Sequence, residues 1–334
     1  MSLPRRQSGY QHAEDKARYE EEADRFCDLI RAVRSTLGFP ATARGYCYYL
    51  EGRGEITKGE FDKAADLISE WRKEGRLACD IVAADETRQA TGLEEIDDND
   101  VEDEAERAIR ACRNWHLGYT PFSFWDDQDV YIEIAVEKND LRNLFKPVCD
   151  RFRIPITNMK GWSDINSRVD MLERFAERHA QGKRCVLLVC GDHDPGGLHI
   201  SDFVHSNLDD VAIPAGCGPD DIDLEIERFG LNKDQIDSLG LMWIDNLETS
   251  SGKDLASARH ADHNKGYVQS YIREFGARKV EANALMAQPD AARELCLDTI
   301  HRYISDQAVE EYEASIEEAR EELADRIAEL MDGE

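Results

Sequence analysis

Six apolar residues in a row, CVLLVC at 185–190, run directly into the polar turn GDHDPGG at 191–197. Because they do not alternate with polar residues, they predict a short strand buried on both faces, as in a parallel sheet covered by helices. An earlier segment, DVYIEIAVE at 129–137, alternates and predicts another strand of the same sheet. Helical patterns and a further short strand lie between them, so the order predicts an α/β fold with a mainly parallel sheet.

Acidic residues stand at the ends of both strands. Glu137 ends the first, and Asp192 and Asp194 follow the buried run. Ligands of open α/β sheets bind beyond the carboxyl ends of the strands, so we expect the three carboxylates to lie together. Carboxylate oxygens suit Mg²⁺, with Mn²⁺ as a substitute, and such a site serves phosphoryl transfer. The alternative is that the two aspartates only shape a polar turn.

The same residues carry a resemblance to a known family. The sequence V-E-K after the first strand, followed by G-D-x-D-P-x-G after the buried one, resembles the Toprim domain of topoisomerases, bacterial primases and OLD-family nucleases. The D-P-x-G form is similar to the A subunit of topoisomerase VI, a type IIB topoisomerase, and to its small stand-alone relatives from mobile elements. The resemblance implies a Rossmann-like Toprim domain in which Glu137, Asp192 and Asp194 hold Mg²⁺, with Glu137 also acting as an acid or base.

The resemblance implies a second site on a helix of an N-terminal winged-helix module. The relatives carry Arg-x-x-Tyr-Tyr there, and the second tyrosine attacks the phosphodiester. Aligned on Arg44, that position falls on Tyr48, whereas Cys47 replaces the first tyrosine and Gly45 follows the arginine. Arg44 lies about one helical turn before Tyr48 and is expected to clamp the scissile phosphate. A shift of one residue would make Tyr49 the nucleophile.

The tyrosine segment leaves alternatives open. Tyr46, Tyr48 and Tyr49 could be aromatic core residues and no more. A free tyrosine hydroxyl has a pKa near ~10, so attack at neutral pH requires a metal, a base or a cation. The late segment KVEANAL at 279–285 resembles the E-x-x-A-L segment of the small relatives, and we expect Glu281 in it to be structural.

The patterns divide the chain into four expected parts. These are an N-terminal helix at 1–36, a winged-helix tyrosine domain at 37–118, a Toprim domain at 119–290 and C-terminal helices at 291–334. Within the second part, GRLACDIVAAD at 75–85 is expected to be extended, after a helix at 58–75. The acid-rich segment 92–107 is expected to be an exposed boundary that leads into a helix.

The charge balance is extreme. The chain has 70 acidic and 41 basic residues, a formal net charge of −29, and only 12 of the basic residues are lysines. Such a surface fits a halophilic protein, in which salt screens the self-repulsion, although an ordinary acidic cytosolic protein is the alternative. No apolar run reaches the roughly 18 residues that cross a bilayer, and no secretory signal is evident. We therefore expect a cytoplasmic, nucleoid-associated protein without a membrane partner.

Three functions remain in view. The first is Mg²⁺-dependent DNA strand cleavage and religation through Tyr48. Since the sequence has no P-loop, ATP-driven strand passage would need a separate ATPase subunit. The second is a Toprim nuclease that hydrolyses DNA with metal-bound water, and the third is a non-catalytic DNA-binding protein of a mobile element, which the departures at Gly45 and Cys47 favour. The resemblance also implies a homodimer that presents two tyrosines.

Overall fold

The computed structural model describes residues 3–5, 12–84, 90, 92–94, 96, 100–159, 164–249 and 253–332. Contacts between residues divide the chain into two compact units. The first unit comprises Met1–Ala84 and Val130–Thr299, and the second comprises Asp85–Asp129 and Ile300–Glu334. Residues 37–84 of the expected tyrosine domain therefore belong to the same unit as the sheet, whereas residues 85–118 belong to the second unit. Each unit is described below by itself.

A four-stranded sheet forms the centre of the first unit. Its strands are β1 (Val130–Val136), β2 (Ile156–Asn158), β3 (Arg184–Cys190) and β4 (Glu225–Gly230). They are all parallel, in the order β2-β1-β3-β4. The α/β class and the parallel sheet are thus confirmed. The alternation of β1 suggested one polar face, but every residue of β1 is buried, because helices cover both faces of the sheet.

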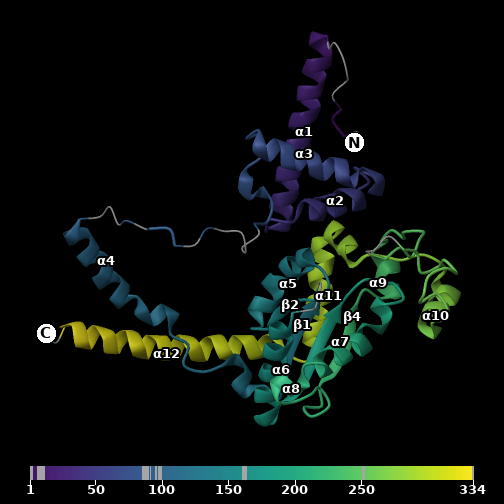
Figure 1. Cartoon of the computed structure of the whole chain (residues 1–334). Coiled ribbons are helices and arrows are strands. Elements are labelled where there is room, and N and C mark those ends of the chain that lie inside the picture. The colour runs from purple at the N-terminus through teal and green to yellow at the C-terminus, as the bar shows by residue number, and fades with distance from the viewer. Residues whose placement is uncertain are drawn as a thin grey trace. The chain divides into compact units, whose positions relative to one another are not determined.

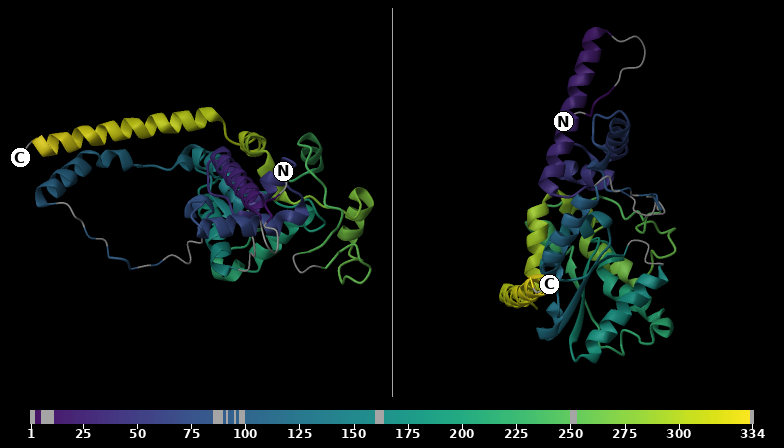
Figure 2. Two further views of the ribbon diagram at one scale, coloured as in Figure 1. Left: turned by 90° about the horizontal axis from the view of Figure 1, so that it is seen from above. Right: turned by 90° about the vertical axis from the view of Figure 1, so that its left-hand side faces the viewer.

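The helices after each strand explain this double cover. Right-handed crossovers place α5 (Asn139–Arg151) on one face and α6 (Ile165–Ala180) and α7 (Ile200–Asp209) on the other, since the chain moves in opposite directions across the sheet. Figures 1 and 2 show these layers. The remaining helical segments of this unit after β3 are η6 (Gly197–His199), α8 (Ala212–Ala215), α9 (Lys233–Ser238), α10 (Gly266–Phe275), η7 (Ala282–Ala287) and the first eleven residues of α11 (Pro289–His301).

The N-terminal helices of this unit are α1 (Ala13–Leu37), α2 (Ala43–Gly52), η1 (Lys58–Glu60) and α3 (Phe61–Lys73). Threonine is a favoured N-cap residue, and Thr42 caps α2: its side chain accepts a hydrogen bond from the Gly45 N–H. Phe26 of α1 packs edge-on against Trp71 of α3, with ring centroids 5.4 Å apart. This aromatic pair is part of the core that holds the three helices together.

The extended segment expected at 75–85 is not a strand among the residues described there. It forms a short 3₁₀ turn, η2 (Cys79–Ile81), and one parallel bridge between Ala41 and Val82. Side chains donate hydrogen bonds to backbone carbonyl groups that would otherwise pair with a neighbouring strand. The Arg72 guanidinium donates to the Cys79 carbonyl, and the Tyr46 hydroxyl donates to the Ile81 carbonyl at 2.6 Å.

Helix α2 packs closely on the sheet part of the unit. The Thr42 N–H and hydroxyl donate to the two carboxylate oxygens of Asp140 at 2.8 and 2.6 Å. A Cβ atom on Gly45 would lie 2.7 Å from Asp140 Oδ2, and one on Gly52 would lie 2.0 Å from the Ala287 Cβ. Glycine at position 45, a departure from the arginine–tyrosine motif, therefore has a packing reason.

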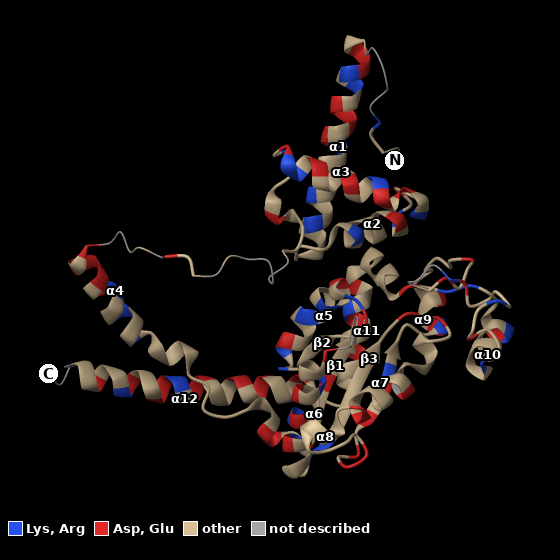
Figure 3. Cartoon of the chain, viewed as in Figure 1, with Lys and Arg blue, Asp and Glu red and all other residues tan. Residues whose placement is uncertain are grey.

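The second unit contains α4 (Val101–Arg113), η4 (Trp115–Gly118), η5 (Phe124–Asp127) and α12 (Asp306–Asp332). The expected charged C-terminal helix is α12, and Figure 3 shows acidic residues along it. The Tyr312 ring of α12 contacts the rings of Phe122 and Phe124, and the Arg320 Nε donates to the Tyr119 carbonyl at 3.1 Å. None of the described helices is both long enough and apolar enough to cross a membrane.

Candidate metal and tyrosine site

The parallel pairing of β1 and β3 brings two of the expected ligands together. Val136 and Cys190 are paired at the ends of these strands, so Glu137 and Asp192 emerge at the same edge. The Glu137 N–H donates to the Cys190 carbonyl at 3.1 Å, and Glu137 Oε2 accepts from the Asp192 N–H at 2.9 Å. The position of both carboxylates therefore follows from the register of the sheet.

A lysine ammonium lies between these two carboxylates. Lys138 Nζ is 2.6 Å from Glu137 Oε1 and 3.0 Å from Asp192 Oδ2. Burial raises the pKa of Asp192 to about 7, and repulsion from Glu137 adds to the rise. For Glu137 burial acts in the same direction, but the charge of Lys138 and the Asp192 N–H outweigh it and lower the pKa. The pair thus prefers one full negative charge on Glu137 and a cation beside it.

Asp194, the third expected ligand, serves the turn. Its Oδ1 accepts from the Gly197 N–H at 2.6 Å, and burial raises its pKa. A Cβ atom on Gly197 would lie 1.8 Å from the Asp192 carbonyl oxygen, so the turn requires glycine there. Among the described residues, no group of three or more His, Cys, Asp or Glu side chains is arranged to hold a metal ion. The donors at Glu137 and Asp192 nevertheless fit a hard cation, because they already converge on an ammonium group.

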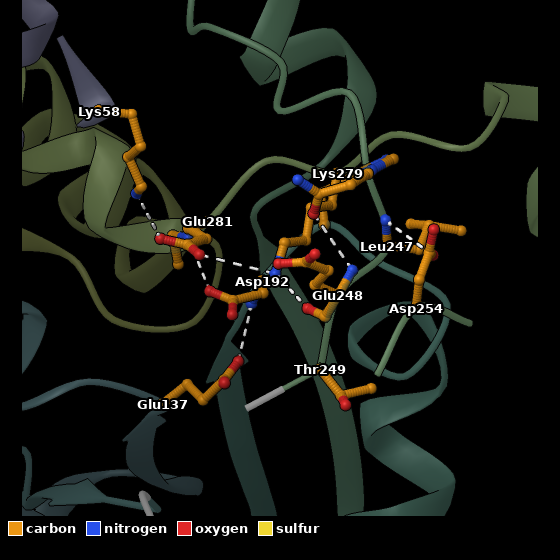
Figure 4. Close-up of polar contacts among 12 residues, drawn as sticks. Lys58, Glu137, Asp192, Leu247, Glu248, Thr249, Asp254, Lys279 and Glu281 are labelled. Carbon is orange, nitrogen blue, oxygen red and sulfur yellow. Dashed lines mark hydrogen bonds and ion pairs between the residues drawn. The ribbon is translucent and has the colours of Figure 1, made fainter. Parts of the chain in front are cut away.

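A cavity of about 610 Å³ opens in front of this edge. Glu137, Lys138, Asp192 and Asp194 line it, and Lys58, Lys279 and Glu281 also lie along its wall. Figure 4 shows how Glu281 and Lys58 lie relative to Asp192. The backbone joins the two groups, because Asp192 Oδ1 accepts from the Ala282 N–H at 2.8 Å, one residue after Glu281.

Tyr48 reaches this cluster from α2. Its hydroxyl donates to Glu281 Oε2, and Lys58 Nζ donates to the same oxygen at 2.9 Å. Burial, followed by the charge of Glu281, raises the pKa of Tyr48 far above its usual value. Burial by itself would raise the pKa of Glu281, because it disfavours the ionised carboxylate. The hydrogen bonds from Tyr48 and Lys58 outweigh burial and lower the pKa to about 2. The tyrosine is therefore held as a neutral hydroxyl beside a carboxylate.

Two neighbouring aromatic residues have other partners. The Tyr49 hydroxyl accepts from Arg53 Nη2 at 2.9 Å, and the Arg53 guanidinium lies 5.2 Å from the centre of the Tyr49 ring. Tyr46 is fully buried, and its hydroxyl is bonded to a backbone carbonyl. Of the three tyrosines, Tyr48 is the one at the acidic cluster.

Arg44 faces a different direction. Arg44 Nη1 lies 3.5 Å from Asp62 Oδ1, and the guanidinium lies 5.8 Å from the centre of the Phe61 ring. The Tyr48 ring also meets Phe61, edge-on at 5.0 Å. Arg44 and Tyr48 thus contact the same phenyl ring, and the charge of Arg44 opposes the rise that burial causes in the pKa of Tyr48, but Lys58 is the cation in direct contact with the tyrosine ring.

A second, smaller cavity of about 190 Å³ is lined by Tyr48. It shares Lys58, Ile244 and Glu281 with the larger cavity, whereas Tyr48 lines the smaller one. Apolar side chains contribute most of the rest of its lining, namely Leu241, Met242, Trp243, Ala284 and Ala287.

The sequence did not reveal the positions that Lys58, Lys138, Lys279 and Glu281 have at this site. Lys138 stands in the V-E-K motif next to Glu137, but its position between the two carboxylates was not expected, and nothing in the local sequence around Lys58 points to Tyr48. Two basic residues at the end of α3 and just after it already have partners. Arg72 donates a hydrogen bond to the Cys79 carbonyl, and Arg76 forms an ion pair with Glu20. Arg88, which follows these residues as a further candidate for DNA contact, lies outside the described residues, as do residues 160–163 of the segment KGWSDINS, whose sequence resembles a turn of the small relatives.

The histidine between the two aspartates is structural. His193 is almost fully buried, its Nδ1 lies 3.0 Å from the Tyr271 hydroxyl, and its ring contacts Trp243 and Phe275. Burial lowers the pKa of His193 to about 4.

Comparison of the chain with known proteins gave no match: no family model, no curated protein and no solved structure matches it. The chemistry of the site therefore rests on its residues and their geometry.

Proposed function

We propose that this protein cleaves and religates DNA strands by transesterification through Tyr48, in the manner of a topoisomerase VI A subunit. One observation supports this most. Tyr48 and Asp192 are 144 positions apart in the sequence. Tyr48 is nevertheless hydrogen-bonded to Glu281, and Asp192 is hydrogen-bonded to the next residue, Ala282. A tyrosine hydroxyl and an acidic strand edge, joined through these two adjacent residues, are the two components that such chemistry needs. We further propose that α1–α3 form a winged-helix module and that the sheet is a Toprim domain.

Mg²⁺, or Mn²⁺ in its place, would be held by Glu137 and Asp192, with Asp194 in the same cavity wall. Bound there, the metal would supply Lewis-acid stabilisation of charge on a phosphodiester. Lys138 marks the position where the two carboxylates accept a cation. We propose that Glu137 also exchanges protons with the reacting oxygens.

The reaction exchanges one phosphodiester for another. The Tyr48 oxygen would form a bond to phosphorus while the bond from phosphorus to a sugar oxygen breaks. Because the phosphotyrosyl ester keeps the bond energy, religation needs no nucleotide. Arg44, whose side chain is 58% exposed, would bind a phosphate of the same strand beside the scissile one.

DNA binding by a chain of net charge −29 requires local cations and screening of its acidic surface. We propose that the protein acts as a homodimer, because two tyrosines are needed to cut both strands. A separate ATPase subunit would couple cleavage to strand passage.

The test is incubation of the purified protein with supercoiled plasmid at several salt concentrations, in Mg²⁺ and then in Mn²⁺. Detergent quenching followed by protease treatment reveals protein-linked cleavage products. We expect wild type to form a covalent adduct and Tyr48→Phe to form none, while Tyr49→Phe still forms it. Cleavage that survives in Tyr48→Phe would exclude the tyrosine mechanism.

One observation favours the second function, a metal-dependent nuclease. The Tyr48 hydroxyl is bonded to a carboxylate, which disfavours the phenolate. In that case cleavage would need Glu137 and Asp192 but not Tyr48, and no adduct would form. DNA binding without cleavage in either metal would instead indicate the non-catalytic role.

A further inference from the structure

We propose that Lys58, and not Arg44, is the cation that stabilises Tyr48 during attack, and that Glu281 holds both side chains ready for it. This inference rests on the proposed transesterase function and assigns two residues to it. It gives Lys58 a catalytic role and gives Glu281, expected to be structural, the role of positioning the nucleophile and accepting its proton.

The position of Lys58 is fixed by the turn that carries it. Lys58 begins η1, and the preceding Thr57 forms a capping box in which its N–H donates to Glu60 Oε2 at 3.0 Å. From there Lys58 Nζ lies 4.2 Å from the centre of the Tyr48 ring and 4.6 Å from that of Phe61. An ammonium group over aromatic rings is stabilised by cation–π attraction, and one of these two rings is that of the proposed nucleophile, Tyr48.

Lys58 is also accessible to a substrate. Its side chain is 35% exposed, and it lines both cavities beside Tyr48. The larger of these is the cavity of the acidic edge, where the scissile phosphate would bind. A lysine side chain can turn its ammonium from one acceptor to another, because its donors sit on a flexible stem.

The charges around Tyr48 explain why a mobile cation is needed. At rest, Lys58 donates to Glu281 Oε2, and Lys279 Nζ lies 3.6 Å from the other oxygen of Glu281. This arrangement keeps Glu281 ionised and Tyr48 protonated. When a phosphate draws Lys58 away, Glu281 loses one of the hydrogen bonds that lower its pKa and becomes more basic. The same movement brings positive charge to the oxygens of the phosphate.

The proposed step exchanges one phosphorus–oxygen bond for another and conserves protons. The hydroxyl proton of Tyr48 passes to Glu281, to which it is already hydrogen-bonded. The tyrosine oxygen bonds to phosphorus, and the sugar oxygen leaves with a proton that Glu137 relays to it from water. The resulting hydroxide takes the proton from Glu281, so the carboxylate is restored and no other reactant is consumed.

The experiment is chemical rescue of Lys58→Ala, measured as the single-turnover rate of adduct formation at saturating DNA. We expect a fall of about 100-fold, the usual effect of removing one group that stabilises transition-state charge. Added methylammonium should raise the rate of Lys58→Ala about tenfold. It should not raise the rate of Lys58→Met, because the methionine side chain fills the space. Lys146→Met, which removes an exposed lysine paired with Asp150 on α5, should behave as wild type.

Arg44→Ala provides the contrast. We expect it to weaken DNA binding and to lower the salt dependence of binding, with a smaller effect on the rate at saturating DNA. Glu281→Gln keeps a hydrogen-bond acceptor for Tyr48 but cannot accept its proton, so its rate should fall as far as that of Lys58→Ala while DNA affinity is kept. Circular dichroism of each variant checks that it is folded.

The outcomes separate this inference from the function on which it rests. A folded Lys58→Ala variant that forms the adduct within threefold of wild type overturns the role of Lys58, while Tyr48-dependent cleavage stands. Rescue of Arg44→Ala but not of Lys58→Ala assigns the cation to Arg44 and also overturns it. If wild type forms no Tyr48-dependent adduct, both the inference and the proposed function are wrong.

Discussion

Glu133 and Glu137 lie four residues apart on and just after β1, and their surroundings differ completely. Glu133, in the middle of the strand, is fully buried and accepts two hydrogen bonds of 2.7 Å from Arg174 and one of 2.8 Å from the Tyr131 hydroxyl. Glu137, at the strand end, has a side chain that is 29% exposed and shares the Lys138 ammonium with Asp192. One carboxylate is enclosed, and the other faces a cavity.

The difference shows how the same residue serves structure in one place and chemistry in another. The planar guanidinium of Arg174 binds both oxygens of Glu133 in a fixed fork, and the Glu133 side chain has no contact with solvent. Lys138 gives Glu137 a single point contact that another cation can replace. Burial with full pairing makes a structural ion pair, whereas partial exposure with a flexible partner makes a binding site.

The largest effect should come from removing the partner of the enclosed carboxylate. Arg174→Met leaves Glu133 buried without its counter-ion, so we expect a loss of about 3–5 kcal/mol in the free energy of unfolding. Urea denaturation followed by circular dichroism measures it. The double variant Glu133→Leu with Arg174→Met should recover most of the loss. A loss below about 1 kcal/mol in the single variant would contradict the assignment.

At the open carboxylate the effect should fall on activity. Glu137→Gln should lower the cleavage rate by about 100-fold, equivalent to about 2.7 kcal/mol in the barrier. Its free energy of unfolding should change by less than about 1 kcal/mol, because the side chain remains partly solvated. Calorimetric titration should also show weaker Mg²⁺ binding. Strong destabilisation with normal metal affinity would place Glu137 with Glu133 as a structural residue.

Glu281 lies between these extremes, with a side chain that is 19% exposed. Its pKa in the folded protein is about 2, below the usual value near ~4.3, so its ionised form stabilises the fold. That stability is fully present above the usual pKa and is lost as pH falls through about 2. We expect its contribution to be on the order of 2 kcal/mol. Unfolding of wild type and Glu281→Gln between pH 5 and 2 should therefore differ in slope, and parallel curves would contradict this.

The smallest effect should come from the exchangeable cation. Lys138→Met removes the ammonium that competes for Glu137 and Asp192, so Mg²⁺ should bind about tenfold more tightly, or about 1.4 kcal/mol. Calorimetry at fixed ionic strength measures this, with Lys146→Met as the control for loss of one positive charge. Weaker binding in Lys138→Met would mean that the lysine organises the carboxylates and does not occupy the cation position.

The sequence located one half of the site more easily than the other. Glu137 and Asp192 could be expected to meet because the apolar patterns predicted parallel strands, whose ends share an edge. Asp194 was expected in the same group by spacing, but the structure uses its carboxylate to hold the turn at Gly197. Arg44 was placed beside Tyr48 by helical spacing, yet spacing does not report that Arg44 pairs with Asp62 while Lys58 contacts the tyrosine ring.

The sequence by itself determined the α/β class, the buried central strand, the cap at Thr42 and the acidic residues at the strand ends. All of these depend on periodicity or on interactions between near neighbours, which a linear pattern records. Only the tertiary structure decided that Tyr48 meets Glu281 and Lys58, and that Glu133 pairs with Arg174. These contacts join residues between 10 and 233 positions apart, and they arise from how helices pack on the sheet and on one another.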